Sequence, residues 1–421
     1  MNHPETTEVT CPAGTVVGCA TETTRSFHSI PYSRISALFN DAVPAPAASL
    51  IDATLPRPDS TALSITTPAH ARPGADLPVM VFIHGGRFEE GSHADSTTGA
   101  EGFARQGVIQ VRIGYRLRLA GLLQFPDDVA SHFRAAHDCQ LALEWVQRNI
   151  ESFGGDPTNV TLVGQSAGAA LVLWLARRDH FRGGFRRALV MSPAFPRVTS
   201  SRRRTVLRAA LGKPLTRAAL NNAAATRVER AYRRLRTAYF TDMALGPGPL
   251  DAAELAEVDL VVTSTREEMH RSGSRIDSIG LGAAFVRTVG AAMGLKRQRA
   301  SAYLKAARRV APGHLAGQLI GDSLIRRWVD QVAEGAPGRV WQAEFASASS
   351  SSPVHHCDDL VHLFTEGTAL NAWVVDFCHG RLPTWPEYRN DDRSVARIAA
   401  DGTGCEIVKD PLGYVREAFG A

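Results

Sequence analysis

The sequence has no apolar run approaching the about eighteen residues that a membrane-spanning helix needs. It also lacks an N-terminal basic cluster followed by an apolar core, so we expect no secretory signal and a cytoplasmic location. A mature secreted protein whose signal had been removed would show the same pattern. With 44% hydrophobic and 21% charged residues among 421, the composition is that of a globular protein able to bury a large core.

Cysteine is scarce and scattered. The six cysteines show neither CxxC spacing nor clustering with other metal-ligating residues. This distribution favours reduced thiols over a disulfide framework or a zinc site, and we expect no bound metal. One of them, Cys139, lies in a helical pattern and is expected in the core. The set comprises Cys11, Cys19, Cys139, Cys357, Cys378 and Cys405.

Acidic residues are nearly absent from one segment. The net charge is only +5, but residues 202–236 carry eleven Lys and Arg against the single acid Glu229. Aromatic residues do not alternate with these charges, so we expect no nucleic-acid partner. A solvated helical face is the simplest interpretation, and attraction of an anionic substrate or partner is the alternative.

The most informative motif that is present is Gly164-Gln165-Ser166-Ala167-Gly168. It follows the apolar run 160–163 and precedes the small and apolar stretch 169–174, which predicts a strand, a tight turn and a helix. Such a turn strains the backbone of the serine, so small residues must flank it. The turn also places the hydroxyl at the helix N-terminus, and Ser166 is therefore the candidate nucleophile.

Hydrophobic patterns elsewhere predict an α/β fold. Residues 8–70 read as short antiparallel strands that lead into a sheet, and the nearly unbroken apolar run 77–83 reads as a central strand covered on both faces. A helix is predicted at 138–150. Further strands are predicted at 108–117, 186–192, 260–262 and 339–345. The alternation indicates a mostly parallel central sheet with helices on both faces.

Two long helical stretches interrupt this alternation. They cover about residues 200–250 and 275–335, and the sequence shows neither an internal repeat nor an interdomain linker. A Ser- and Ala-rich stretch at 346–352 is expected to be a loop. We therefore predict a single domain over residues 1–421 in which the two helical stretches are cap insertions.

Two glycines follow the predicted central strand, in His84-Gly85-Gly86. A glycine pair at this end of a strand lets backbone N–H groups turn toward a ligand, as an oxyanion hole requires. A tight turn without a function is the alternative.

A serine nucleophile also needs a base and a carboxylate that orients the base, and α/β-hydrolases order them Ser, acid, His. Ser166, Glu268 and His356 occur in that order, each just beyond a predicted strand.

With these residues in place, the chain resembles the type-B carboxylesterase family, which includes the cholinesterases and bacterial para-nitrobenzyl esterases. The resemblance spans roughly residues 12–415, and its signatures recur in the family order at compatible spacing. Besides the Ser166 motif, the matching stretches are Ile30-Pro31-Tyr32-Ser33, Ile83-His84-Gly85-Gly86, Tyr115-Arg116-Leu117, Ala142-Leu143-Glu144-Trp145-Val146, Asn149-Ile150, Phe153-Gly154-Gly155-Asp156-Pro157, Ser264-Thr265-Arg266-Glu267-Glu268, His356-Cys357-Asp358-Asp359-Leu360 with Phe364, and Trp385-Pro386-Glu387-Tyr388.

The resemblance implies an α/β-hydrolase that cleaves a small-molecule carboxylic ester through an acyl-serine, without a cofactor, as a monomer or homodimer. It implies Ser166 as the nucleophile, Glu268 as the acid and His356 as the base. The implied oxyanion donors are the backbone N–H groups of Gly86, Arg87 and Ala167.

Two of these assignments require a choice between neighbours. Glu268 is preferred over Glu267 because the family's acid is the second carboxylate of its Thr-Arg-Asp-Glu pattern. His356 is preferred over His355 because it alone has Asp359-Leu360 at the family's spacing.

Two departures from the family bear on specificity. Arg87 stands where the family usually has a small residue, and Gln165 stands where it often has Glu; both are candidates for contact with the substrate. We expect the Arg87 side chain to pair with Glu89 or Glu90. The alternative is that it binds a carboxylate or phosphate of the substrate.

Two other functions stay open at this point. Hydrolysis of amides or carbamates would use the same three residues. A catalytically silent relative that acts as a binding module is less favoured, because such proteins typically lose a triad residue and this chain keeps all three.

Overall fold

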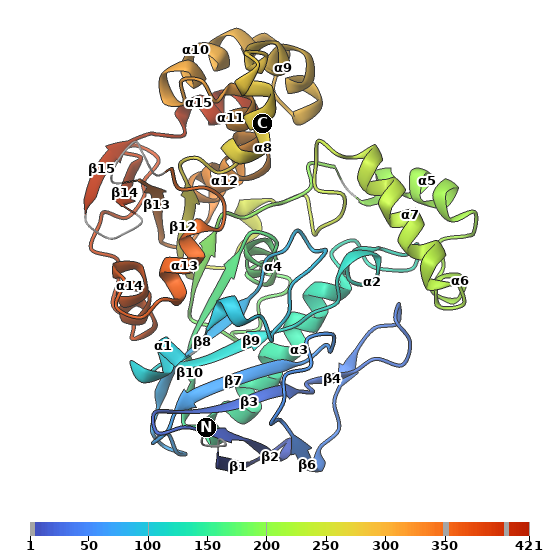
Figure 1. Ribbon diagram of the computed structural model, residues 1–421, viewed down its shortest axis with the longest axis vertical. Coiled ribbons are helices and arrows are strands. Elements are labelled where there is room, and N and C mark those ends of the chain that lie inside the picture. Colours follow the sequence, from blue (N-terminus) through green and yellow to red (C-terminus); the bar gives the residue numbers. More distant parts are fainter. Residues whose placement is uncertain (1–4, 100, 199, 348–352, 400–403, 421) are drawn as a thin grey trace.

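The computed structural model describes residues 5–99, 101–198, 200–347, 353–399 and 404–420. Most of the loop predicted at 346–352 lies outside these residues. A thirteen-stranded sheet crosses the molecule (Figure 1), in the order β1-β2-β3-β7-β9-β8-β10-β11-β12-β13-β14-β15, with β6 added beside β2. A separate ribbon joins β4 (Ser33–Arg34) and β5 (Val43–Pro44).

The strands of the large sheet have the following bounds: β1 Glu5–Cys11, β2 Gly14–Ala20, β3 Thr24–Ile30, β6 Ala48–Asp52, β7 Leu63–Pro68, β8 Leu77–Ile83, β9 Ile109–Ile113, β10 Gly155–Gln165, β11 Arg187–Met191, β12 Asp259–Thr265, β13 Val340–Ala346, β14 Ser394–Ala399 and β15 Cys405–Lys409. From β9 through β14 in the sheet order, all neighbours pair in parallel. The lead-in strands β1, β2, β3 and β7 pair antiparallel. The predicted mostly parallel sheet with an antiparallel lead-in is thus confirmed.

Strand β8 spans the predicted residues 77–83 and is buried on both faces. Val79, Val81 and Ile83 belong to one hydrophobic core, whereas Met80 and Phe82 belong to another. Successive side chains of a strand point to opposite faces, so this unbroken apolar run supplies both cores at once.

Helices cover both faces, as predicted. Their bounds are α1 Glu101–Arg105, α2 Arg118–Leu122, α3 Arg134–Asn149, α4 Ala167–Leu175, α5 Ser200–Leu211, α6 Arg217–Asn221, α7 Ala225–Ala238, α8 His270–Ser278, α9 Gly282–Val289, α10 Ala300–Val310, α11 Leu315–Gly321, α12 Arg327–Gly335, α13 Asp358–Phe364, α14 Ala369–Cys378 and α15 Gly413–Phe419. Helices α3, α4 and α12 contribute to the core of Val79, and α1, α13 and α14 to the core of Met80.

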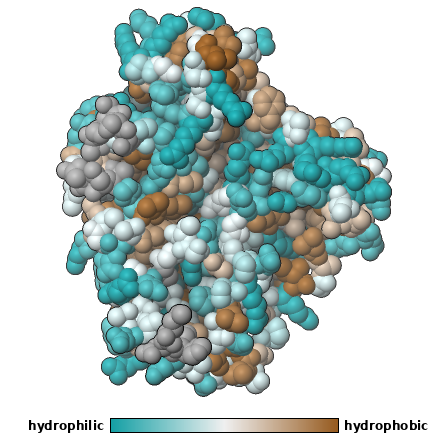
Figure 2. All heavy atoms as spheres, viewed as in Figure 1, coloured by the Kyte–Doolittle hydropathy of each residue, from teal (hydrophilic) through white to brown (hydrophobic). Residues whose placement is uncertain are grey.

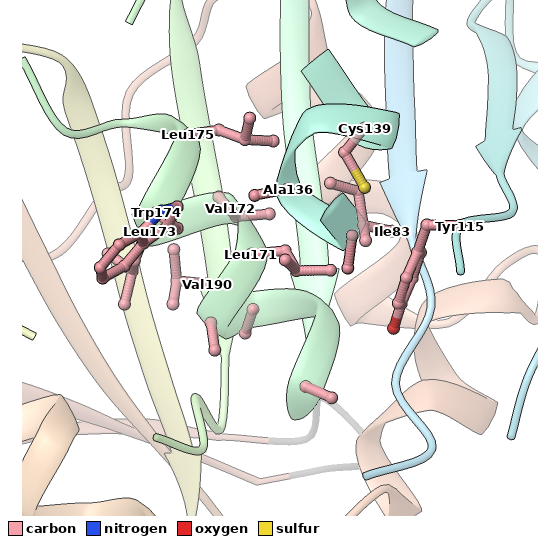
Figure 3. Close-up of a cluster of buried hydrophobic side chains, with 14 of the residues drawn as sticks. Ile83, Tyr115, Ala136, Cys139, Leu171, Val172, Leu173, Trp174, Leu175 and Val190 are labelled. Carbon is pink, nitrogen blue, oxygen red and sulfur yellow. The ribbon is translucent and has the colours of Figure 1, made fainter. Parts of the chain in front are cut away.

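Helix α4 follows the serine motif and is apolar on all sides because the sheet and α3 enclose it. Its side chains Leu171 and Val172 lie beside Ala136 and Cys139 of α3 (Figure 3). Cys139 is fully buried, as predicted from its helical pattern. All six cysteines are free thiols.

The two predicted helical stretches contain the expected helices, although residues 239–250 of the first stretch are not helical. Helices α5 to α7 project to one side of the sheet, and α8 to α11 gather with α15 at another end (Figure 1). Hydrophilic side chains cover the α5–α7 block (Figure 2), and α7 exposes Arg227, Arg230, Arg233 and Arg234. These four fit the predicted solvated face. Arg203 of the same basic segment does not, because it is buried and paired with Asp242.

Some elements differ from prediction. Helix α3 begins at Arg134 rather than Asp138, and the strands β14 and β15 had not been predicted at all. Within the described ranges, no individual helix has the length and apolarity to cross a membrane, and only the bent pair His270–Ser278 and Gly282–Met293 meets those criteria jointly.

Candidate active site

The predicted strand, turn and helix around Ser166 are present. Strand β10 ends at Gln165, α4 begins at Ala167, and Ser166 between them has φ 55° and ψ −115°. A Cβ at Gly168 would lie 2.0 Å from the Ile83 carbonyl oxygen, and one at Gly164 would lie 2.6 Å from the Gly168 oxygen. Both glycines are therefore required by close backbone approach, which supports the strained conformation of the serine.

The structure brings together the three residues predicted from distant parts of the chain. His356 Nε2 lies 3.0 Å from Ser166 Oγ, and His356 Nδ1 lies 2.7 Å from Glu268 Oε2. With a proton on Nδ1 donated to the carboxylate, Nε2 is left to accept the serine proton. The His356 side chain is 17% exposed and that of Glu268 only 1%.

Glu268 is fixed by two further hydrogen bonds. The Ser192 hydroxyl donates to its Oε1 over 2.6 Å, and the Thr265 backbone N–H donates to the same oxygen over 2.8 Å. Ser192 directly follows β11 and has φ 50°. Sequence reasoning missed Ser192, although this residue ends the strand predicted at 186–192.

Glu267 and His355, the neighbours that the sequence analysis did not favour, have other partners in the structure. The Glu267 carboxylate accepts a hydrogen bond from the Val354 N–H at 3.2 Å. His355 faces Asp358, with 3.3 Å between Nδ1 and the carboxylate oxygen. Among the described residues, neither side chain forms a hydrogen bond with Ser166, Glu268 or His356.

The charges around His356 and its burial shift its pKa in opposite directions. Burial lowers the pKa of His356, but the Glu268 carboxylate and hydrogen bonds with Cys357 and Glu268 outweigh it, so the pKa lies well above its ordinary value. The imidazole therefore keeps its second proton to a higher pH than an ordinary histidine.

A second carboxyl group lies near Glu268. Asp359 is 1% exposed, and neither of its carboxyl oxygens has a hydrogen-bond partner on another described residue. Burial, reinforced by the charge of Glu268, raises the pKa of Asp359 to about 7. In the sequence analysis, Asp359 served only to choose between His355 and His356.

The loop after β8 lies against the nucleophile. His84 stacks on Tyr115, and the Tyr115 hydroxyl donates to the His84 carbonyl over 2.9 Å. A Cβ at Gly85 would lie 3.3 Å from Ser166 Cβ. Gly86 has φ 95°, and a Cβ there would lie 2.1 Å from the Glu90 carbonyl oxygen. Glycine is thus required at both positions.

This loop leaves backbone donors open. Within the part of the chain that the structure describes, the N–H groups of Gly86 and Arg87 donate to no acceptor. Ala167 is the first residue of α4, where an N–H has no partner within the helix. These are the three donors that the family resemblance implied.

Gln165 is 1% exposed. Its side-chain amide donates to Cys357 Sγ over 3.0 Å and lies 3.4 Å from His356 Nε2. The expected contact of Gln165 with substrate is not favoured by this buried position, in which the amide instead supports the loop that carries His356.

The expected ion pair of Arg87 is not formed. Glu89 pairs with Arg236 at 3.1 Å and accepts a hydrogen bond from the Tyr232 hydroxyl at 2.9 Å. Arg87 is exposed, has φ 57°, and has no ion pair or side-chain hydrogen bond with any described residue.

One cluster has metal-ligating side chains. Asp41, Asp128 and His132 place one ligand atom each within 4.8 Å of one another. Arg134 and Arg217 form ion pairs with both aspartates. The arginines neutralise the carboxylates, so the cluster is better suited to hold the loop than a cation.

The sheet with its parallel centre, the turn at Ser166 and the open amides after β8 define an α/β-hydrolase. Solved structures support this class. The chain superposes on a PNB esterase with a TM-score of 0.77 at 23% identity, covering 97% of this chain and 99% of that one. It superposes on carboxylesterase EST55 of Geobacillus stearothermophilus with a TM-score of 0.76 at 22% identity, covering 98% and 100%.

Sequence comparisons give the family. A model of the carboxylesterase family matches residues 5–213. The chain is 29% identical to a probable N-octanoylanthranilate hydrolase of Rhodococcus erythropolis, over 94% of this chain and 98% of the relative. It is 43% identical to carboxylesterase 5A of Ovis aries, but over only 32% of this chain and 35% of that protein. The chain belongs to the carboxylesterase family, as the motifs had predicted, and is a carboxylesterase that acts on a small-molecule ester.

Proposed function

We propose that this protein hydrolyses carboxylic esters through an acyl-serine intermediate, with Ser166 as nucleophile, His356 as base and Glu268 as acid. The observation that carries the proposal is the continuous hydrogen-bonded chain from Ser166 Oγ through both ring nitrogens of His356 to the Glu268 carboxylate. It joins the three groups in the order that nucleophilic acyl transfer requires.

The mechanism follows from the geometry. His356 Nε2 takes the proton of Ser166 as Oγ attacks the carbonyl carbon, and Glu268 stabilises the imidazolium that forms. The N–H groups of Gly86, Arg87 and Ala167 hold the oxyanion of the tetrahedral intermediate. His356 then gives its proton to the leaving alcohol, and a water molecule deprotonated by His356 releases the acid from Ser166.

Amide hydrolysis is the second candidate. It is favoured by the likeness to a probable N-octanoylanthranilate hydrolase, whose named substrate is an N-acyl compound, along nearly the full length of both chains. A panel that pairs each O-acyl ester with the N-acyl amide of the same acid separates the two activities. Higher kcat/KM for the amides would favour the second candidate.

The test of the proposed function is turnover of a chromogenic 4-nitrophenyl ester. Ser166→Ala deletes one hydroxyl and should lower kcat by about 10⁴- to 10⁶-fold. A circular dichroism spectrum and melting temperature close to those of the parent would show that the variant folds. Near-normal turnover by the folded variant would overturn the proposal, and a parent protein that turns over neither esters nor amides would favour a silent binding module.

A further inference from the structure

A cavity of about 330 Å³ opens beside the loop that follows β8. It lies between this loop and the segment that runs from the end of α7 to residue 244, and its lining includes Arg87, Glu89, Arg236, Phe240 and Asp242. A volume of this size is at the lower end for small-molecule sites, which suits part of a ligand rather than a whole one. A larger cavity of about 780 Å³ borders residues 114–120 and α7 but does not include Arg87, and the proposed triad lines neither of these two cavities.

The cavity is joined to the site of reaction by Arg87 itself. The backbone N–H of this residue is one of the proposed oxyanion donors, and its side chain lines the cavity. The neighbouring Gly85 lies against Ser166, because a Cβ there would be 3.3 Å from Ser166 Cβ. Arg87 therefore belongs both to the proposed oxyanion hole and to the lining of the cavity.

The other charged groups of the lining already have partners. Arg236 pairs with Glu89 at 3.1 Å, and the Tyr232 hydroxyl holds the same carboxylate at 2.9 Å. Asp242 forms an ion pair with the buried Arg203 and accepts from the Arg197 N–H. Arg87 alone among the charged lining residues has no ion pair with any described residue.

One carboxylate of the loop, Glu90, is exposed and has no ion pair with any described residue, and its Cγ would lie 3.1 Å from a Cβ at Gly86, but it does not line the cavity. The guanidinium of Arg197 lies 3.8 Å from Asp242 in addition to the closer pair with Arg203, so two cations face one carboxylate behind the cavity wall. Four arginines, Arg87, Arg236, Arg203 and Arg197, thus stand against the three carboxylates of Glu89, Asp242 and Glu90, and among the described residues that line the cavity only Arg87 is a charged residue without an ion pair. A planar guanidinium presents parallel N–H donors that match the two oxygens of a carboxylate.

We propose that this cavity is a subsite for a carboxylate carried by the substrate and that the Arg87 guanidinium binds it. The substrate class is an ester with a free carboxylate a few bonds from the reacting carbonyl, either a half-ester of a dicarboxylic acid or an ester of a hydroxy acid. The proposal rests on the proposed function and adds the chemical class of substrate to it.

The test compares matched esters that differ only in the carboxylate. One pair places it on the acyl part, 4-nitrophenyl hydrogen glutarate against 4-nitrophenyl pentanoate. The other places it on the alcohol part, 4-carboxyphenyl butyrate against 4-methylphenyl butyrate. The measured quantity is the ratio of kcat/KM for the anionic ester to that for the neutral one. Both esters use the same backbone donors, so any change in the oxyanion hole cancels in this ratio.

Arg87→Gln should lower the ratio about 10- to 100-fold in one of the two pairs, the range expected for loss of a charged hydrogen bond. Arg87→Lys should keep most of it, because the charge remains. The pair that responds identifies whether the carboxylate belongs to the acyl or the alcohol part. Equal losses for the anionic and neutral esters in both pairs would overturn the proposal.

The matched control is Arg233→Gln, which removes the same charge from α7 outside the cavity. Arg233 is 70% exposed and only 4.0 Å from Glu229. The control should leave the ratio unchanged within about twofold, because Arg233 does not line the cavity and its solvent-exposed charge is screened by salt. If Arg87→Gln and Arg233→Gln lower the ratio equally, the effect is general attraction by the basic helix and the proposed subsite is wrong.

Glu89→Gln gives a gain of function as a second test. It removes the carboxylate that neutralises Arg236, so a second cation of the lining becomes available and the ratio should rise. A parent enzyme without activity on any ester would instead count against the proposed function, whereas an active parent with equal kcat/KM for anionic and neutral esters would count against this subsite alone.

Discussion

The polar groups on the two sides of Ser166 differ in whether they have hydrogen-bond partners within the protein. On one side, His356 and Glu268 are tied to each other, and Ser192 and Thr265 complete the hydrogen bonds of the carboxylate. On the other side, the N–H groups of Gly86 and Arg87 and the Arg87 guanidinium have no partner among the described residues.

This difference separates two tasks. The acid and the base must keep one geometry through every step, and the fold fixes them by burial and by hydrogen bonds from strand ends. The oxyanion side must bind a group that the protein does not supply, and its donors are therefore left open. Substitutions on the first side should change the rate for all substrates, whereas substitutions of Arg87 should change the choice among them.

The largest effect should come from the base. His356→Ala removes the group that accepts the serine proton and should lower kcat by about 10⁴- to 10⁶-fold. His355→Ala removes only a contact with Asp358 and should stay within about tenfold of the parent. Steady-state turnover of a 4-nitrophenyl ester measures both. The reverse order of the two losses would place the base at His355.

Glu268→Gln tests the acid at nearly the same scale. The amide cannot stabilise the imidazolium and permits the wrong tautomer of His356, so kcat should fall by about 10³- to 10⁴-fold. Glu267→Gln is the matched control, because Glu267 contacts the Val354 N–H rather than the histidine. Comparable losses for the two variants would contradict the separation drawn between these neighbours.

The pH dependence of kcat/KM should report the raised pKa of His356. The base must be neutral to accept a proton, so activity should rise with pH, with a midpoint above the ordinary value of about 6.5 and a tenfold fall per pH unit well below it. Cys357→Ala removes one hydrogen bond that raises this pKa and should move the midpoint down. A midpoint at or below about 6.5 in the parent would contradict the electrostatic account.

The last prediction concerns stability rather than rate. Burial raises the pKa of Asp359 to about 7, against 3.8 for an ordinary aspartate. Between these values the folded protein binds one more proton than the unfolded chain, so this group lowers stability as pH rises through the window. Asp359→Asn removes the penalty. The free energy of unfolding of the variant minus that of the parent should therefore be larger at pH 8 than at pH 3.5, by about 4 kcal/mol or less.

Chemical denaturation of the parent and Asp359→Asn at both pH values measures that change. Equal destabilisation at both values would mean that the carboxylate makes a favourable contact that the amide loses. Such a result would remove Asp359 from the set of groups that shape the charge around Glu268.

Local patterns predicted much of this molecule. The apolar run 77–83 gave the bounds of β8, because burial on both faces leaves no polar interruption. The glycines around Ser166 gave the turn, because close backbone approach admits no side chain. The choice of Glu268 over Glu267 and of His356 over His355 came from the family resemblance rather than from a local pattern.

The features that were not predicted depend on side-chain contacts that local sequence patterns do not reveal. The expected pair of Arg87 with Glu89 fails because Tyr232 and Arg236, more than 140 residues away, take the carboxylate. Helix α3 begins earlier than expected, at Arg134, and this residue is buried and paired with Asp128. Gln165 is a candidate for contact with the substrate, and its side chain lies beside His356 and Cys357, almost two hundred residues later in the chain. The partners of Glu89 and Gln165 lie far along the chain, whereas Asp128 is only six residues from Arg134.

The central claim is that Ser166 is activated by His356, and covalent labelling tests it most directly. The folded protein is treated with an organophosphate, and the adduct is located by peptide mass spectrometry in the parent, His356→Ala and His355→Ala. The account predicts an adduct on Ser166 in the parent and in His355→Ala, and a labelling rate at least about 10³-fold lower in His356→Ala. An adduct on another serine, or equal labelling of Ser166 in all three proteins, would contradict it.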